Sequence, residues 1–304
     1  MGERVNRIPI VQNEEPSLRL QRARNQIYVR AKALFYLQLF LTVLVPVVTA
    51  FWAIFVPEWK PFAAFAALAI VLLDVTFLDR AQRQLLKLAA KIGEERDCEI
   101  LELPWNEFTV GKRVEPETIH GAATAYAKRN DDAKLRDWYS PIVGQVPIHL
   151  ARIICQRTNL WYDAKLRKYY GATILTLAIF LVFVLFLTAL IADRTMTSFI
   201  ISVMAPAAPV LIWAVREHYR QHDTANLLDN IRSQAEALWD RAKNGRCKPP
   251  YCGVQSREFQ NAIYTHRATN PLVFPPIYTL LRSSMEQQMH HAAEHWVRDA
   301  GYDV

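Results

Sequence analysis

The sequence is poor in cysteine and glycine, with 4 and 9 of these residues in a chain of 304. So few cysteines cannot staple a small secreted domain, and so few glycines cannot form a collagen-like repeat. Charge is also scarce, because Asp, Glu, Lys and Arg together make up 21% of the chain, whereas hydrophobic residues make up 52%. A disordered chain has few apolar residues and a high net charge, so that class is excluded as well.

The apolar residues are concentrated in four runs that are nearly free of charge, at 33–57, 61–78, 169–192 and 195–215. Each is close to the ~20 residues that an α-helix needs to cross the ~30 Å hydrocarbon core of a bilayer. A surface helix of a soluble domain would carry a polar face, which these runs lack. The sequence therefore predicts an all-α membrane protein with two transmembrane hairpins. A signal peptide is not expected, because 32 mostly polar residues precede the first run and no cleavage motif follows it.

Lys and Arg are distributed very unevenly along the chain. All but two of the 36, Lys60 and Arg194, lie in an N-terminal arm (1–32), a middle domain (79–168) or a tail (216–304). The positive-inside rule places these three segments, and so both termini, in the cytoplasm. A net charge of +7 suits anionic headgroups or an anionic ligand, although ordinary positive-inside bias would also account for it.

The three cytoplasmic segments show mostly helical patterns. The second apolar run is expected to continue past residue 79 as an amphipathic stalk, and a helix that begins at Pro147 is expected to run into the third. The alternation at 99–103, which Pro104 ends, predicts a short strand. The fourth run is expected to continue into a tail helix that Asn244-Gly245 closes, with two further helices after Pro249 and Pro276.

Signatures of catalysis and of metal binding are weak. The chain has neither a phosphate-binding Gly-x-x-x-x-Gly-Lys-Ser/Thr loop nor a Gly-x-Ser-x-Gly elbow. His291, Glu294 and His295 match an inverted zincin pattern, but a third protein ligand would have to come from the nine residues that follow. Cys247 and Cys252 lack the second close pair that a zinc ribbon needs. We therefore expect a protein that is not an enzyme and holds no metal or cofactor.

Asp74 is the one ionisable residue inside an apolar run. A carboxylate at the bilayer centre costs ~2.5–3.5 kcal/mol on insertion scales, so such a residue is a functional candidate by default. Asp74 lies four residues before Leu78 at the cytoplasmic boundary, where water can reach it. It is therefore either an interfacial residue or an acid that lines a pore or relay.

Basic residues alternate with aromatic and amide residues just before the third run. An Arg fork can hold a phosphate and a Trp or Tyr face can stack a base, so this passage suits an anionic ligand that carries bases. An alternative is a juxtamembrane helix whose aromatic and basic side chains meet lipid headgroups. The candidate ligand-binding residues of this passage are Arg152, Gln156, Arg157, Asn159, Trp161, Lys165 and Arg167.

Several short passages, spread over nearly the whole chain, together resemble one family. They include Trp138-Tyr139, Cys155-Gln156-Arg157-Thr158-Asn159, Asp163-Ala164-Lys165-Leu166-Arg167, Arg257-Glu258-Phe259-Gln260 and Ile263-Tyr264-Thr265-His266-Arg267. In these passages the chain is similar to the SMODS-associating four-transmembrane effectors. The resemblance adds His266 and Arg267 to the ligand-binding candidates. The chain departs from the family's Tyr-Asn-His-Arg-Arg-Ser-Asn-Pro pattern at Thr265, Ala268 and Thr269, so that one Arg is missing.

The resemblance implies an effector of CBASS, a bacterial anti-phage signalling system. Such an effector would lie in the inner membrane and respond to a cyclic di- or oligonucleotide made by a neighbouring nucleotidyltransferase. It would then permeabilise the membrane, as a homo-oligomer and without binding DNA or RNA polymers. The alternative is a membrane-anchored sensor or scaffold that forms no pore, and a channel or transporter comes third because Asp74 alone offers charge within the runs.

Overall fold

The computed structural model describes residues 5–45, 60–191, 195–200, 205–270 and 272–303, and all regular structure within these ranges is helical. The prediction of an all-α protein is therefore confirmed for this part of the chain. The long helices are α2 (Glu15–Leu39), α4 (Lys60–Leu73), α5 (Asp79–Ile100), α8 (Ile148–Ile191), α10 (Ala205–Lys243), α11 (Pro249–Thr269) and α12 (Pro275–Asp299). The short ones are α1 (Ile8–Val11), α6 (Glu107–Val110), α7 (Pro116–Ala127), α9 (Met196–Phe199), the 3-10 helix η4 (Pro141–Gln145) and the π-helical η1 (Phe40–Leu44) and η3 (Asp74–Leu78).

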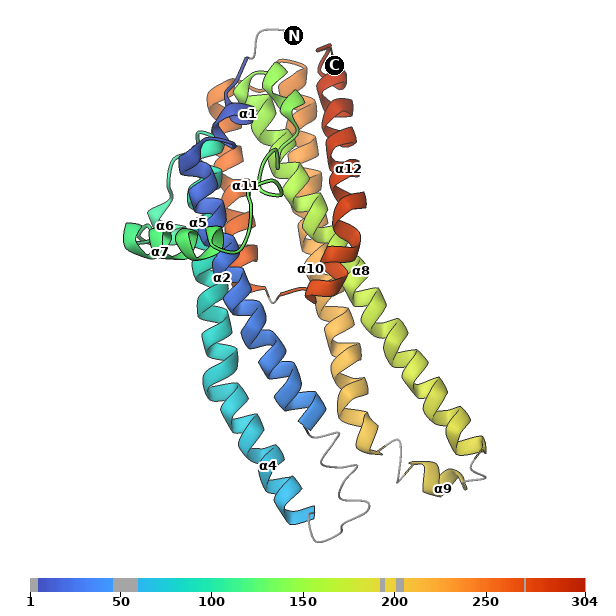
Figure 1. The fold of residues 1–304 in the computed structure, drawn as a ribbon. Helices are drawn as coiled ribbons and strands as arrows, with labels where there is room; N and C mark the ends of the chain where they lie inside the picture. Colours follow the sequence, from blue (N-terminus) through green and yellow to red (C-terminus); the bar gives the residue numbers. More distant parts are fainter. Residues whose placement is uncertain (1–4, 46–59, 192–194, 201–204, 271, 304) are drawn as a thin grey trace.

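The long helices form two legs that share one bundle (Figure 1). One leg pairs α2 with α4 and α5, and the other pairs α8 with α10. Helix α11 packs between α5 and α8, and α12 packs along α8, so both cover only the end of the bundle that also holds α1. Helices α4 and α9 lie at the opposite end (Figure 1).

Several helices pass from an apolar run into a polar segment without a break. Helix α8 starts directly after Pro147 and continues for 44 residues, and α4, η3 and α5 follow one another from residue 60 to residue 100. Helix α10 ends at Lys243, where Gly245 takes a φ of 67° that favours glycine. The predicted stalks, the start at Pro147 and the end at Asn244-Gly245 are thus confirmed.

The main hydrophobic core lies at the α1 end of the bundle. It joins α1, α5, α8, α10, α11 and α12 around Trp239, which is 1% exposed. The Trp239 indole donates a hydrogen bond of 2.8 Å to the Asp299 carboxylate and meets the Trp296 ring edge-on. Buried polar groups and apolar packing therefore fix the position of α12 against α10.

The opposite end exposes apolar side chains on both legs. A soluble protein seldom exposes a contiguous apolar surface of this kind, because its helices bury their apolar faces. Large exposed residues on α4 and η3 include Phe62, Phe65, Leu68, Val71, Val75 and Phe77, and those on α8 include Leu177, Ile179, Phe180, Phe183 and Ile191. Both sets belong to predicted membrane spans.

Among the described residues, one helix is long and apolar enough to cross a membrane by itself. It covers Ile148–Leu187 of α8, and its most apolar window has a mean hydropathy of 2.5. Helix α4 has 14 residues, and residues 46–57 of the first run and 201–204 of the fourth lie outside the described residues. The four-span arrangement of 33–57, 61–78, 169–192 and 195–215 therefore stays a prediction.

The strand predicted at 99–103 is wrong. Helix α5 extends to Ile100, and the chain then turns at Glu102, whose φ of 50° lies in the left-handed region. Leu101 and Leu103 are both buried in the main core, although they flank an exposed residue as in a strand. The alternation thus reflects a helix end that packs against the core. The described part of the chain contains no neighbouring strand with which this segment could pair.

Candidate functional site

A cavity of about 420 Å³ lies inside the bundle, between the two legs and below the main core. Helices α2, α8, α11 and α12 supply most of its wall, and α5, α7 and α10 add single residues. Its cationic lining residues are Arg24, Lys32, Arg167, His266, Arg267 and Arg282, and its aromatic ones are Tyr28, Tyr126, Trp138, Tyr162 and Tyr278. Asp163 is the one carboxylate among the described residues that line it.

Four of the nine predicted ligand-binding residues line this cavity. Asn159 and Arg167 reach it from α8, and His266 and Arg267 from α11. Asn159 donates to the Tyr139 hydroxyl at 2.9 Å and accepts from the Trp138 indole at 3.2 Å. The structure therefore brings together residues that lie more than 100 positions apart in the sequence.

Asp163 organises the cationic residues around it. Its carboxylate is in contact with the His266 ring and 3.3 Å from the Arg167 guanidinium. Burial alone would raise the pKa of Asp163, but Arg167 and His266 outweigh it and hold that pKa well below its usual range. Arg167 also donates to Gln221 of α10 at 2.7 Å. The Asp163 carboxylate therefore fixes the positions of the Arg167 and His266 side chains in the cavity wall.

Arg152 and Gln156 lie on another face of α8 and contact the protein itself. The Arg152 guanidinium donates to the Glu102 carbonyl at 2.7 Å and to the carbonyl of Leu101, where α5 ends. The Gln156 amide is fully buried and donates to the Ser256 carbonyl of α11 at 2.7 Å. In this structure both side chains join α8 to neighbouring helices outside the cavity.

Arg157, Trp161 and Lys165 share a third face of α8, which points toward α12. Arg157 pairs with Glu236 at 2.8 Å and lies over the Trp296 ring at 4.7 Å. Lys165 stands over the Trp161 ring at 4.9 Å and donates to Gln288 of α12. Arg157 and Trp161 are four positions apart and so lie on one face, and in the structure Glu236 is the acid that pairs with Arg157.

The surroundings of Arg157 predict a structural effect of its loss. We expect Arg157→Ala to lower the free energy of unfolding by ~1–3 kcal/mol, because Glu236 loses a charge-assisted hydrogen bond and Trp296 a covering cation. Thermal unfolding of the detergent-solubilised protein measures this change. Unchanged stability of Arg157→Ala together with reduced nucleotide binding would contradict this structural role and would indicate that Arg157 binds the ligand.

Asp74 is at the start of η3 and does not line the cavity. Its side chain is half-buried, and Gln38 of α2 hydrogen-bonds to it. One Asp74 carboxylate oxygen is buried without a hydrogen-bond partner in the described part of the chain. This position, between the two helices of one leg, leaves both interpretations of Asp74 open.

Helices α2 and α12 supply seven charged, aromatic and amide residues of the cavity that were not predicted from the sequence. They are Gln21, Arg24, Asn25, Tyr28 and Lys32 on α2, and Tyr278 and Arg282 on α12. The α2 residues recur every three or four positions and so share one face of the helix. A polar-aromatic periodicity in the arm was the signal that could have found them.

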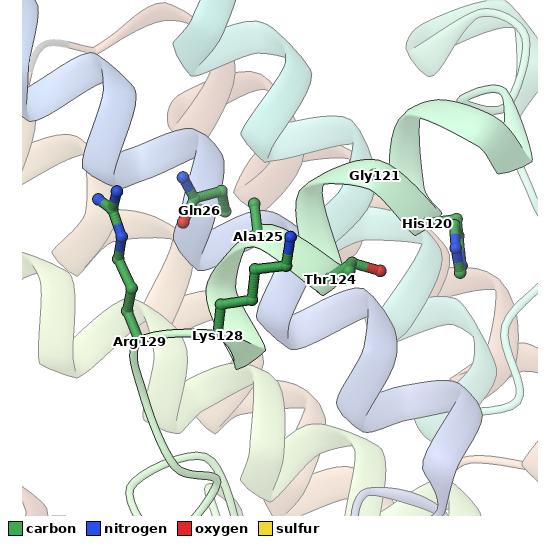
Figure 2. A pocket seen from close by; sticks show the side chains of 7 residues that line it. All are labelled: Gln26, His120, Gly121, Thr124, Ala125, Lys128 and Arg129. Atoms are coloured by element: carbon green, nitrogen blue, oxygen red, sulfur yellow. The ribbon is translucent and has the colours of Figure 1, made fainter.

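A second, shallower hollow of about 340 Å³ lies between α2 and α7 (Figure 2). Its cations, Lys128 and Arg129, are exposed, and Gly121 and Ala125 form a small-residue floor. Solvated surface cations bind anions weakly, because water already stabilises them. The internal cavity is therefore the better candidate for a functional site.

The comparison with known families agrees with this arrangement. Residues 6–296 match the model of the SMODS-associating 4TM effector domain. The chain belongs to that family. A protein of Bacillus cereus (strain VD146), described as a probable CBASS effector molecule, is 20% identical to the chain over 284 residues. The aligned region covers 91% of this chain and 94% of that protein. No solved structure matches the chain.

Position 268, where the chain lacks the Arg of the family pattern, does not belong to the cavity wall. Ala268 packs beside Tyr264 and Trp105, in a small cluster between α5, α6 and α11. His266 and Arg267, which the chain retains, are the residues of this motif that line the cavity. The departure from the family pattern therefore leaves the cavity lining intact.

Proposed function

We propose that this protein is an effector of bacterial anti-phage defence that responds to a cyclic oligonucleotide and then permeabilises the inner membrane. The family and the relative described as a probable CBASS effector support the defence role. The observation that carries the ligand is the cavity, whose lining includes Arg24 and Lys32, two cations without a carboxylate partner among the described residues. Phosphodiesters supply the missing negative charge, and the aromatic residues offer faces on which bases stack.

The size and position of the cavity restrict the ligand to a small molecule. A volume of about 420 Å³ inside a helical bundle is typical of small-molecule sites, whereas polymeric DNA or RNA needs an open groove. In this proposal the ligand acts as a signal rather than as a substrate. A neighbouring nucleotidyltransferase would supply it.

The proposed topology has four spans, with both termini and the bundle in the cytoplasm. The exposed apolar ends of both legs support it, as does the position of nearly all Lys and Arg on the bundle side. Helices α2, α5, α8 and α10 each join the cavity region to an apolar run, so movement at the cavity reaches the bilayer directly. We assign the conducting path to a homo-oligomer. Asp74 is the candidate acid on that path.

Leakage from reconstituted vesicles tests this function. Purified protein in vesicles loaded with a fluorescent dye should release the dye when cyclic di-AMP, a cyclic AMP–GMP dinucleotide or cyclic tri-AMP is added. Protein without nucleotide, and nucleotide with protein-free vesicles, are the controls and should release little. Binding without release would instead favour a membrane-anchored sensor, and neither binding nor release would overturn the proposal.

A further inference from the structure

One face of α2 presents two cations with an aromatic ring between them. Arg24, Tyr28 and Lys32 are spaced by four residues, so all three point to the same side of the helix and line the cavity. The eight residues from Arg24 to Lys32 correspond to ~12 Å along the helix axis, a separation that the long side chains of Arg and Lys can narrow. The Arg24 guanidinium lies 5.5 Å from the Tyr28 ring centre.

These two cations differ from the others in the cavity because no carboxylate pairs with them in the described part of the chain. Arg167 pairs with Asp163, Arg267 with Asp97 and Arg282 with Glu286. Asp97, the acid that Arg24 influences from a distance, is already bound to Arg267 at 2.6 Å. Because the other cations already have carboxylate partners, Arg24 and Lys32 are the cations with which an incoming anion can pair.

Both side chains are half-buried, and no counter-charge pairs with either among the described residues. Burial, and then the nearby Arg282, lower the pKa of Lys32, whose amine also lies 5.8 Å from the Tyr278 ring centre. The Nε atom of Arg24 is buried and has no hydrogen-bond partner in the described chain. Desolvated cations are costly unless an anion compensates them, so their retention in a cavity points to an anionic ligand.

Helix α5 holds Arg24 in place. A Cβ added at Gly93 would lie 3.2 Å from the Arg24 Nε, so this glycine leaves the space in which the side chain lies. Arg96, one turn further along α5, is 1% exposed, and two of its nitrogens have no hydrogen-bond partner among the described residues. Its positive charge, close enough to influence Arg24, adds to the field at this end of the cavity.

We propose that Arg24 and Lys32 each bind one phosphate of the ligand and that Tyr28 stacks a base between them. The assignment rests on the proposed function and specifies it further: the ligand must carry at least two phosphodiesters, as a cyclic di- or trinucleotide does. A nucleoside monophosphate reaches one of the two cations only. Because α2 leads into the first apolar run, the bound phosphates lie directly on a helix that is proposed to enter the membrane.

Binding of cyclic di-AMP, the cyclic AMP–GMP dinucleotide and cyclic tri-AMP to the full-length, detergent-solubilised protein tests this assignment. For the probe that binds best, Arg24→Gln and Lys32→Gln should each reduce affinity at least tenfold. Tyr28→Ala should reduce the affinity for that probe more than Tyr28→Phe does, because phenylalanine keeps a ring on which a base can stack. AMP should bind at least tenfold more weakly than that probe. Arg19→Gln and Arg30→Gln are matched controls, because both residues are exposed on α2 and neither lines the cavity, and should change affinity less than twofold.

The stability of the ligand-free variants separates binding from folding. Removing an uncompensated cation should leave the melting temperature of Arg24→Gln and Lys32→Gln unchanged or raise it. A lower melting temperature alongside lost binding would mark a structural role and overturn the assignment, as would wild-type affinity in both variants. If the wild-type protein binds none of the cyclic probes, the proposed function fails together with this inference. Binding that does not depend on the two cations overturns the inference alone.

Discussion

Arg257→Ala is expected to lower the free energy of unfolding by ~3–5 kcal/mol, the usual consequence of removing one partner of a buried ion pair. Arg257 contacts the carboxylate of Glu94, which is fully buried. The Arg257 guanidinium also donates a hydrogen bond of 2.9 Å to the Pro104 carbonyl. Without the guanidinium, Glu94 keeps only uncharged partners such as the Gln260 amide. The apparent melting temperature in detergent should fall on the order of 10 °C.

An exposed ion pair on the same helix as Glu94 provides the control for this prediction. Arg83 pairs with Asp79 at 2.9 Å, and the Arg83 side chain is 75% exposed. Arg83→Ala should therefore cost less than about 1 kcal/mol. The double variant Glu94→Gln/Arg257→Met should recover much of the lost stability, because no buried charge is left unpaired. Equal effects of Arg257→Ala and Arg83→Ala would contradict the burial argument.

The long helices could be predicted because their signals are local. Apolar runs too long for a surface helix, Pro147 at a helix start and Gly245 after a helix end each act within a few residues. The segment 99–103 could not be predicted in the same way, because alternating apolar residues arise both in a strand and at a helix end that packs against a core. Leu101 and Leu103 are buried by packing of distant helices at the end of α5, which the local sequence does not record.

The candidate site could be predicted only in part because α8 turns its side chains to three different neighbours. Asn159, Asp163 and Arg167 recur every four residues and face the cavity, whereas Arg157, Trp161 and Lys165 recur at the same spacing and face α12. The periodicity separates these sets, but it does not indicate which set faces a ligand. That choice depends on where α2, α11 and α12 pack.

A ladder of buried polar groups leads from the cavity toward the apolar ends of α8 and α10. Arg167, which contacts Asp163 in the cavity wall, donates a hydrogen bond of 2.7 Å to the side-chain oxygen of Gln221. The side-chain nitrogen of Gln221 in turn donates to the Glu217 carboxylate at 2.7 Å. Gln221 is fully buried, and Glu217 is 4% exposed. One turn closer to the apolar run, a Cβ at Gly171 would lie 3.3 Å from α10, so the two helices are in close contact there. The ladder therefore couples the cavity wall to the interface between the two helices of one leg.

Gln221→Leu is expected to separate binding from the membrane response. Leucine fills a similar volume but cannot bridge Arg167 to Glu217, so a change at the cavity wall no longer moves α10. Nucleotide affinity should stay within about threefold of wild type, because Gln221 does not line the cavity, while nucleotide-triggered dye release should fall at least tenfold. Asn226→Leu, an exposed amide on the same helix, is the matched control and should release dye like wild type. Undiminished release by a Gln221→Leu protein that still binds nucleotide would show that coupling runs through other contacts.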